Sequence, residues 1–169
     1  MGQLSRFATF LYVGSLLSGC SALHQQIVAS ARQPGDQIVT TPETVLKEPN
    51  CVKRPRPFAH FESMEVLPEM VKPGARVNYR VVYVMCPLKL AESIRTRMTR
   101  SMFFKGEQVA SNVKDGFELK PGRWIVDSFF TLPPDSPMGV YALEVAFGSH
   151  AQKQVRSFVV SSEFYLSGE

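Results

Sequence analysis

Alternation of apolar and polar residues in short runs is the feature that most constrains the fold of this chain. Apolar residues recur at every second position over residues 77–85 and again over residues 141–147. Because successive side chains of a β-strand point to opposite faces, this period of two gives each strand one apolar face. Similar runs follow from residue 58 onward and are separated by Pro and Gly turn signals, as at residues 72–74 and 120–122. The pattern predicts an all-β domain.

Seven or eight short strands fit these runs, over residues 60–66, 77–85, 94–104, 108–112, 124–132, 141–147 and 155–160. Tight turns are expected at residues 105–106 and 115–116. The three prolines of residues 133–139 predict a loop, because proline cannot donate to a sheet ladder. A parallel α/β fold would need helices of about ten residues or more between its strands, and the sequence offers none there. The sequence therefore predicts an antiparallel β-sandwich of seven or eight strands.

One corner of the expected sandwich has a recognisable pattern. Pro137, Gly139 and Tyr141 lie at alternate positions and lead into a hydrophobic strand. The pattern is similar to the corner at which immunoglobulin- and fibronectin-type sandwiches place a tyrosine, and residues 61–160 resemble these sandwiches in strand count and spacing. Leu143 occupies the position where antibody domains carry a bridged cysteine. The resemblance implies a single immunoglobulin-like domain without that bridge.

The N-terminus has the composition of a secretory signal peptide. Residues 1–6 carry one positive charge, and residues 7–17 form a predominantly apolar run of eleven residues. A helix of that length spans about 17 Å, short of the roughly 30 Å hydrocarbon core of a bilayer. Residues 1–19 are therefore expected to be a cleaved signal peptide.

The signal ends in Leu17-Ser18-Gly19-Cys20, which resembles the lipobox of bacterial lipoprotein precursors. Small residues let the peptide enter a protease as an extended strand, and a cysteine thiolate is the nucleophile that accepts a diacylglycerol group. The resemblance implies that Cys20 becomes the acylated, palmitate-bearing first residue of the mature protein. A core cysteine after a hydrophobic strand is the alternative, but it does not account for the order of charge, apolar run, small residues and cysteine.

Acylation at Cys20 predicts a lipid anchor at a membrane, since each buried CH₂ group contributes about 0.8 kcal/mol to membrane binding. Ser21 follows the cysteine. In lipoproteins of Gram-negative bacteria, a residue other than aspartate at that position favours the outer membrane. The expected location is therefore the cell envelope, on the periplasmic side of the outer membrane.

Residues 20–58 are expected to form a lipidated flexible tether, and residues 59–169 the sandwich domain. The tether region has weak periodicity and contains the dense Lys-Arg-Pro run of residues 53–57, which cannot continue a helix or a central strand. A flexible chain of this length has an r.m.s. span of roughly 30–40 Å. The tether is thus expected to hold the domain clear of the lipid headgroups.

Cys51 and Cys86 are the two cysteines that remain after Cys20. In an oxidising compartment an even number of cysteines favours a disulfide, which here would join the end of the tether to the domain. Two separate buried thiols are the alternative interpretation.

The sequence carries no local motif for catalysis, metal binding or a cofactor, so neither an enzyme nor a metal or cofactor site is expected. Its three histidines, His24, His60 and His150, are scattered, and no His or Cys pair has a metal-ligand spacing. Asp127 or Glu144 paired with a histidine is the remaining route to catalysis. An isolated acid on the polar face of a strand is ordinarily solvated, however.

Four arginines, Arg80, Arg95, Arg97 and Arg100, are the best candidates for a binding site. If the strands that carry them pair, three of them form a basic stripe on one solvent face, which suits an anionic glycan or lipid such as cell-wall polymer or lipopolysaccharide. The alternative is a solvated face that keeps the sheet soluble. The formal charge of +4, or +3 after loss of residues 1–19, is too small to predict a nucleic-acid partner.

Phe103 and Phe129 point away from the expected core faces of their strands. Exposed together they would mark a protein-interaction patch, whereas the alternative places them beneath a loop. The whole sequence thus predicts a membrane-anchored, non-catalytic binding or scaffold domain that contacts another component of the envelope, with a protein partner expected. The alternative function is recognition of an anionic glycan or lipid, and a hydrolase or periplasmic chaperone is less favoured.

Overall fold

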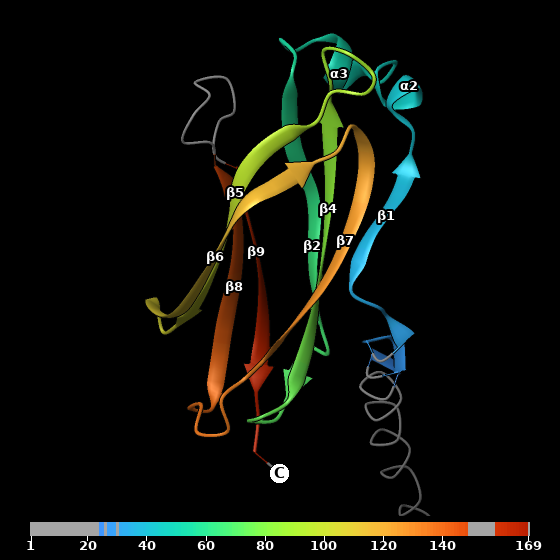
Figure 1. Cartoon of the computed structure of the whole chain (residues 1–169). Coiled ribbons are helices and arrows are strands. Elements are labelled where there is room, and N and C mark those ends of the chain that lie inside the picture. The colour runs from blue at the N-terminus through green and yellow to red at the C-terminus, as the bar shows by residue number, and fades with distance from the viewer. Residues whose placement is uncertain (1–23, 26, 30, 149–157, 169) are drawn as a thin grey trace, which may run out of the picture.

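Two β-sheets make up most of the computed structural model, which describes residues 24–25, 27–29, 31–148 and 158–168 (Figure 1). The first sheet has four strands in the order β1-β7-β4-β2. Its strands are β1 (Gly35–Thr40), β2 (Phe58–Leu67), β4 (Arg76–Cys86) and β7 (Gly122–Thr131). All of its neighbouring strands run antiparallel.

The second sheet has five strands in the order β3-β9-β8-β5-β6. Its strands are β3 (Met70–Val71), β5 (Ile94–Phe104), β6 (Glu107–Leu119), β8 (Gly139–Gly148) and β9 (Phe158–Leu166). The short β3 pairs parallel to β9, and the other pairs are antiparallel. Both sheets pack against each other, so the prediction of an all-β sandwich is confirmed (Figure 1).

The core lies between the sheets and follows the predicted alternation. On β4, the inward-facing residues are all 2% exposed or less: Val77, Tyr79, Val81, Tyr83 and Met85. They belong to one core cluster with the inward face of β8, whose residues are 4% exposed or less: Tyr141, Leu143, Val145 and Phe147. Full burial of one such side chain contributes about 1.5–3 kcal/mol, so this double row is a main source of stability.

The expected corner forms around Tyr141. Its hydroxyl donates a hydrogen bond to the carbonyl oxygen of Pro137 at 2.8 Å. Burial raises the pKa of the phenol above its ordinary value. The bond fixes the start of β8 against the loop that precedes it.

The segment expected to be a flexible tether is folded from residue 35 onward, which corrects that prediction. Strand β1 lies along the edge of β7, with Gly35 opposite Asp127. Helices α2 (Pro42–Val45) and α3 (Pro49–Val52) follow before β2 begins. The side chains of β1 are mostly exposed, so its place in the sheet comes from main-chain pairing, which leaves no apolar pattern in the sequence.

The disulfide between Cys51 and Cys86 is present, as predicted, with the two Cα atoms 5.6 Å apart. It joins α3 to the end of β4 within a second small cluster of buried residues that also contains Val45, Phe58 and Val84. Residues 35–58 are therefore part of the sandwich through pairing, packing and a covalent bond.

One predicted turn is confirmed, whereas a second turn and the end of the last strand differ from the prediction. Residues 105–106 form the turn between β5 and β6 with positive φ at both positions, as expected. Asp115 and Gly116 lie inside β6, where the register to β5 shifts, so they form a β-bulge rather than a hairpin turn. Strand β9 extends to Leu166, beyond the predicted end at residue 160, and residues 149–157 lie outside the described residues.

Candidate functional site

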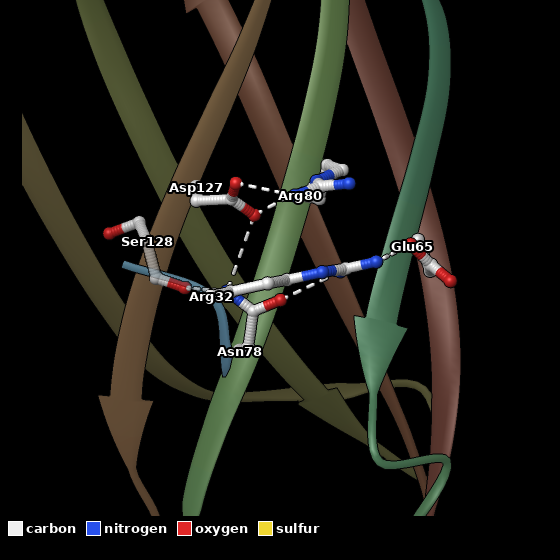
Figure 2. A network of polar contacts seen from close by, with 6 residues as sticks. All are labelled: Arg32, Glu65, Asn78, Arg80, Asp127 and Ser128. Carbon is white, nitrogen blue, oxygen red and sulfur yellow. Dashed lines mark hydrogen bonds and ion pairs between the residues drawn. The ribbon is translucent and has the colours of Figure 1, made fainter. Parts of the chain in front are cut away.

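The first predicted site residue, Arg80, belongs to a polar network on the outer face of the four-stranded sheet (Figure 2). Arg80 lies opposite Asp127 in the β4–β7 ladder, and its guanidinium donates two hydrogen bonds to that carboxylate, at 3.0 and 2.8 Å. The hydrogen bond to Asp127 raises the pKa of Arg80 above its ordinary value. The charge of Arg80 is thus compensated within the sheet rather than offered to an anionic partner.

The same network holds the segment that precedes β1 onto the sheet. Arg32 crosses the outer face of β4 and donates to Asn78 Oδ1 at 2.8 Å and to Glu65 Oε2 at 2.6 Å (Figure 2). The side chain of Arg32 is only 9% exposed. Asn78, which is 1% exposed, in turn donates to the carbonyl oxygen of Ser128 at 3.2 Å. Arg32 thus joins the N-terminal segment to β4 and β2, and Asn78 links this contact to β7.

The N-terminal segment also reaches one end of the sandwich. The side-chain oxygen of Gln25 accepts a hydrogen bond from the backbone N–H of Glu69, between β2 and β3. Glu69 in turn accepts from the backbone N–H of Tyr165 near the end of β9. The loop before β8 lies at this end too, because Pro134 lies beside Gly74 in the turn before β4. We call this end of the molecule the loop end.

The four predicted arginines do not form a stripe, which corrects that expectation. Arg80 is in the four-stranded sheet and the other three are on β5 in the five-stranded sheet, so their strands do not pair. Arg95 is exposed and lies opposite Glu118, and Arg97 donates to Asp115 at 2.6 Å. Arg97 and Arg95 share the outer face of β5.

Arg100 differs from these, because it has the same parity along β5 as the buried residues Ile94, Thr96 and Met98. Its guanidinium points between the sheets and donates to the hydroxyl of Tyr79 at 3.1 Å. A second hydrogen bond goes to Asn112 on β6. Arg100 is therefore a partly buried arginine directed toward the space between the sheets, and it does not share the outer face of Arg95 and Arg97.

Phe103 and Phe129 lie on different sheets, so the structure does not bring them together as a patch. Both are partly buried. The guanidinium carbon of Arg76 lies 4.0 Å from the ring centroid of Phe129 and covers it as a cation–π contact.

A pocket of about 430 Å³ opens where Arg100 lies. It lies between β5 and β6 on one side and the end of β7 on the other, and the loop before β8 borders it at Pro133, Ser136 and Pro137. Its interior wall consists of Met102, Phe104, Phe130, Tyr141 and Leu143. The volume falls in the range of small-molecule sites in proteins, roughly 300–1,000 Å³.

A second polar cluster, around Arg123, attaches residues 35–58 to the sandwich at the end opposite the loop end. Arg123 donates two hydrogen bonds to the carboxylate of Glu48, at 2.9 and 2.8 Å, and two to that of Glu62, at 2.8 and 2.9 Å. A fifth goes to Thr40 at 3.1 Å. The hydrogen bonds to Glu62 and then to Glu48 raise the pKa of Arg123 above its ordinary value.

Sequence reasoning missed Arg32 and Arg123, because their partners are far along the chain. Glu48 is separated from Arg123 by 75 positions and Asn78 from Arg32 by 46. A strand pattern gives the face of a residue but not its cross-sheet or loop partners. The parity of Arg100 was a usable signal, since it matches the apolar positions of its strand.

The predicted acids do not pair with a histidine in the described part of the chain. Asp127 binds Arg80 and Asn78, and Glu144 lies on β8 opposite Ser101 and Ser161. Among the residues that the structure describes, no three His, Cys, Asp or Glu side chains gather as a metal site would require. His150 lies outside the described residues.

Cys20 and Ser21 also lie outside the described residues. None of the helices that the structure describes has the length and apolar character required to cross a bilayer.

No protein-family model matches the sequence, and no curated protein sequence matches it. Among solved structures, the chain is similar to the sporulation control protein Spo0M from Bacillus subtilis, with 20% identity and a TM-score of 0.44 over 66% of this chain and 50% of that one. It is also similar to the alkylpurine DNA glycosylase AlkC from Pseudomonas fluorescens, with 15% identity and a TM-score of 0.47 over 65% and 30% of the two chains. The chain thus spans half or less of the length of these proteins. Likenesses at this level carry no conclusion about activity.

Proposed function

We propose that this chain is a lipid-anchored envelope protein whose β-sandwich is a non-catalytic binding or scaffold domain for another envelope component. The anchor is Cys20, at the end of Leu17-Ser18-Gly19-Cys20. The partner contacts the sandwich directly, and in this proposal that partner is a protein.

The observation that carries the proposal is the attachment of the N-terminal segment to the loop end through Gln25, with Arg32 held on the sheet behind it. Cys20 precedes Gln25 by five residues, a link that covers at most about 18 Å. An acylated Cys20 would therefore hold the loop end close to the membrane surface. This is a shorter and more defined connection than a tether through residue 58.

The outer-membrane location follows from Ser21 and is part of the same proposal. Recognition of a glycan or lipid by an arginine stripe is not favoured, because the arginines do not form one. Arg80 and Arg97 are paired with Asp127 and Asp115, and Arg100 is directed between the sheets. A protein partner at the exposed surfaces is therefore the favoured interpretation.

The test is incorporation of labelled palmitate into the full chain in cells, with Cys20→Ser as the comparison and Ser21→Thr as a matched substitution next to the acceptor. The wild type and the Ser21 variant should be labelled and recovered with membranes, because the acceptor thiol and the four-residue motif are intact. The Cys20 variant should carry no label. Equal labelling of the wild type and the Cys20 variant, or a wild-type protein recovered in the soluble fraction, would refute the anchor.

A further inference from the structure

The pocket beside Arg100 has an unusual combination of an apolar wall and one cation. Met102 and Phe104 follow Arg100 on the inward face of β5, Leu143 lies beside Met102 on β8, and Phe130 on β7 belongs to the opposite sheet. A guanidinium is a costly group to place among such side chains unless its charge is compensated. The pocket therefore raises the question of which group compensates the positive charge of Arg100.

Three other arginines that are at least partly buried in the sandwich have a carboxylate partner. Arg32, Arg80 and Arg123 each contact at least one Glu or Asp. Arg100, by contrast, is bound by two neutral groups, Tyr79 and Asn112, and no carboxylate of the described residues forms an ion pair with it.

Arg100 also has unused donors. A guanidinium has five N–H groups, and the two recorded hydrogen bonds of Arg100 occupy two of them. Its Nε is buried and has no partner among the described residues. Guanidinium donors match the two oxygens of a carboxylate in a parallel pair of hydrogen bonds. The site thus has a positive charge and free donors but no anion of its own.

We propose that the pocket beside Arg100 binds an apolar monocarboxylate of the fatty-acid type. The carboxylate accepts hydrogen bonds from Arg100, and the apolar chain lies along Met102, Phe104 and Leu143. The pocket volume of about 430 Å³ suits a chain of medium length. Asn112 and Tyr79 hold the guanidinium in place, so the cation is positioned before the ligand arrives.

This inference goes beyond the proposed protein-binding role, because it adds a small-molecule ligand to the sandwich, and it does not depend on the lipid anchor. The two are separable because ligand binding is measured on the full chain with Cys20→Ser, purified without detergent, in which no acyl chain of the protein is present. Intact palmitate labelling with no ligand binding would overturn only the ligand, and the reverse result only the anchor.

The experiment is a calorimetric titration of this chain with decanoate and with 1-decanol, which has the same chain length but no charge. We expect one decanoate per chain and an affinity for decanoate at least roughly tenfold higher than for decanol. The reason is that the carboxylate of decanoate compensates the charge of Arg100 through charge-assisted hydrogen bonds, whereas the hydroxyl of decanol does not. Equal affinities, or no saturable binding of decanoate, would overturn the proposal without any variant of the pocket.

Two matched substitutions then locate the ligand. Arg100→Met keeps a long side chain but removes the charge, so it should lower decanoate affinity to that of decanol. Arg95→Met changes an exposed arginine on the outer face of the same strand and should leave the preference unchanged. A decanoate preference that survives in a folded Arg100→Met chain contradicts the assignment, as does its loss in the Arg95 variant.

Discussion

Arg123 makes most of the side-chain hydrogen bonds between the segment of residues 35–58 and the rest of the sandwich. It binds Glu48 from that segment and Glu62 from β2, and its side chain is 21% exposed. Removing a partly buried cation leaves two carboxylates without their partner. We expect Arg123→Ala to lower the free energy of unfolding by about 2 kcal/mol.

Urea denaturation followed by circular dichroism measures this change. Arg95→Ala is the matched control, because Arg95 is exposed and surface substitutions usually change stability by less than about 0.5 kcal/mol. An Arg123 variant as stable as the Arg95 variant would show that the cluster contributes nothing net.

His60 gives the sandwich a pH dependence. It lies on β2, its Nδ1 is buried without a partner among the described residues, and burial lowers its pKa below the ordinary value of 6.5. Glu62 partly opposes the shift, and Arg54 and Arg123 add to it. Between the ordinary pKa and the lower folded one, the unfolded chain binds more protons than the folded one.

Stability should therefore be complete above pH 6.5 and fall as the pH drops through the folded pKa of His60. Denaturation midpoints between pH 8 and pH 5 measure the slope, which His60→Gln should reduce and the exposed His24→Gln should not. A slope that is unchanged in the His60 variant would assign the pH dependence to other groups.

At the scale of single residues, the alternation of apolar and polar positions predicts which face of a strand a residue occupies, but not which residues it contacts. Tyr79 and Tyr83 were expected inside and are 1% and 2% exposed. Arg80 was correctly placed on the outer face, yet its pairing with Asp127 depends on which strands become neighbours. Charge alone groups Arg100 with Arg95 and Arg97, although its position along the strand differs from theirs by an odd number.

At the scale of elements, the strands with a buried apolar face were predictable, whereas β1 and β3 were not. Strand β1 has exposed side chains, and β3 spans Met70–Val71 only. Such strands are held by backbone hydrogen bonds, which any residue except proline can make. Likewise, Asp115 and Gly116 fit a hairpin turn in isolation, and only the continued pairing of β5 on both sides makes them a bulge.

The disulfide is the strongest single tie between elements. Cys51 and Cys86 are separated by 35 positions, and closing a loop of that length in the unfolded chain contributes about 3–4 kcal/mol to stability. We expect reduction by dithiothreitol to lower the unfolding free energy by this amount. The double variant Cys51→Ser, Cys86→Ser should show the loss without reductant and no further response to it, and equal stability of all forms would contradict the estimate.

At the scale of the whole molecule, the N-terminal segment determines how the sandwich is oriented relative to whatever Cys20 is attached to. Arg32 is the main contact, because it is almost buried and binds both Asn78 and Glu65. We expect Arg32→Ala to release this segment and leave the sandwich intact, at a local cost of about 1–2 kcal/mol.

Hydrogen exchange measured by mass spectrometry separates the two effects. Residues 24–32 should exchange faster in the Arg32 variant, while peptides from β4 and β8 should keep their protection. Arg54→Ala, in the exposed stretch before β2, is the comparison and should leave residues 24–32 unchanged. Equal exchange of residues 24–32 in both variants would show that Arg32 does not hold the segment.

The bond between Cys51 and Cys86 also determines whether proteolytic cleavage separates the chain into two pieces. The site considered is the exposed stretch between α3 and β2, where Lys53 precedes Arg54. Cleavage after Lys53 divides the backbone into two pieces, with Cys51 in one and Cys86 in the other. The pieces stay joined through sulfur, and a denaturing gel resolves them only after reduction. A nicked molecule thus keeps its sandwich connected to everything carried by the N-terminal piece.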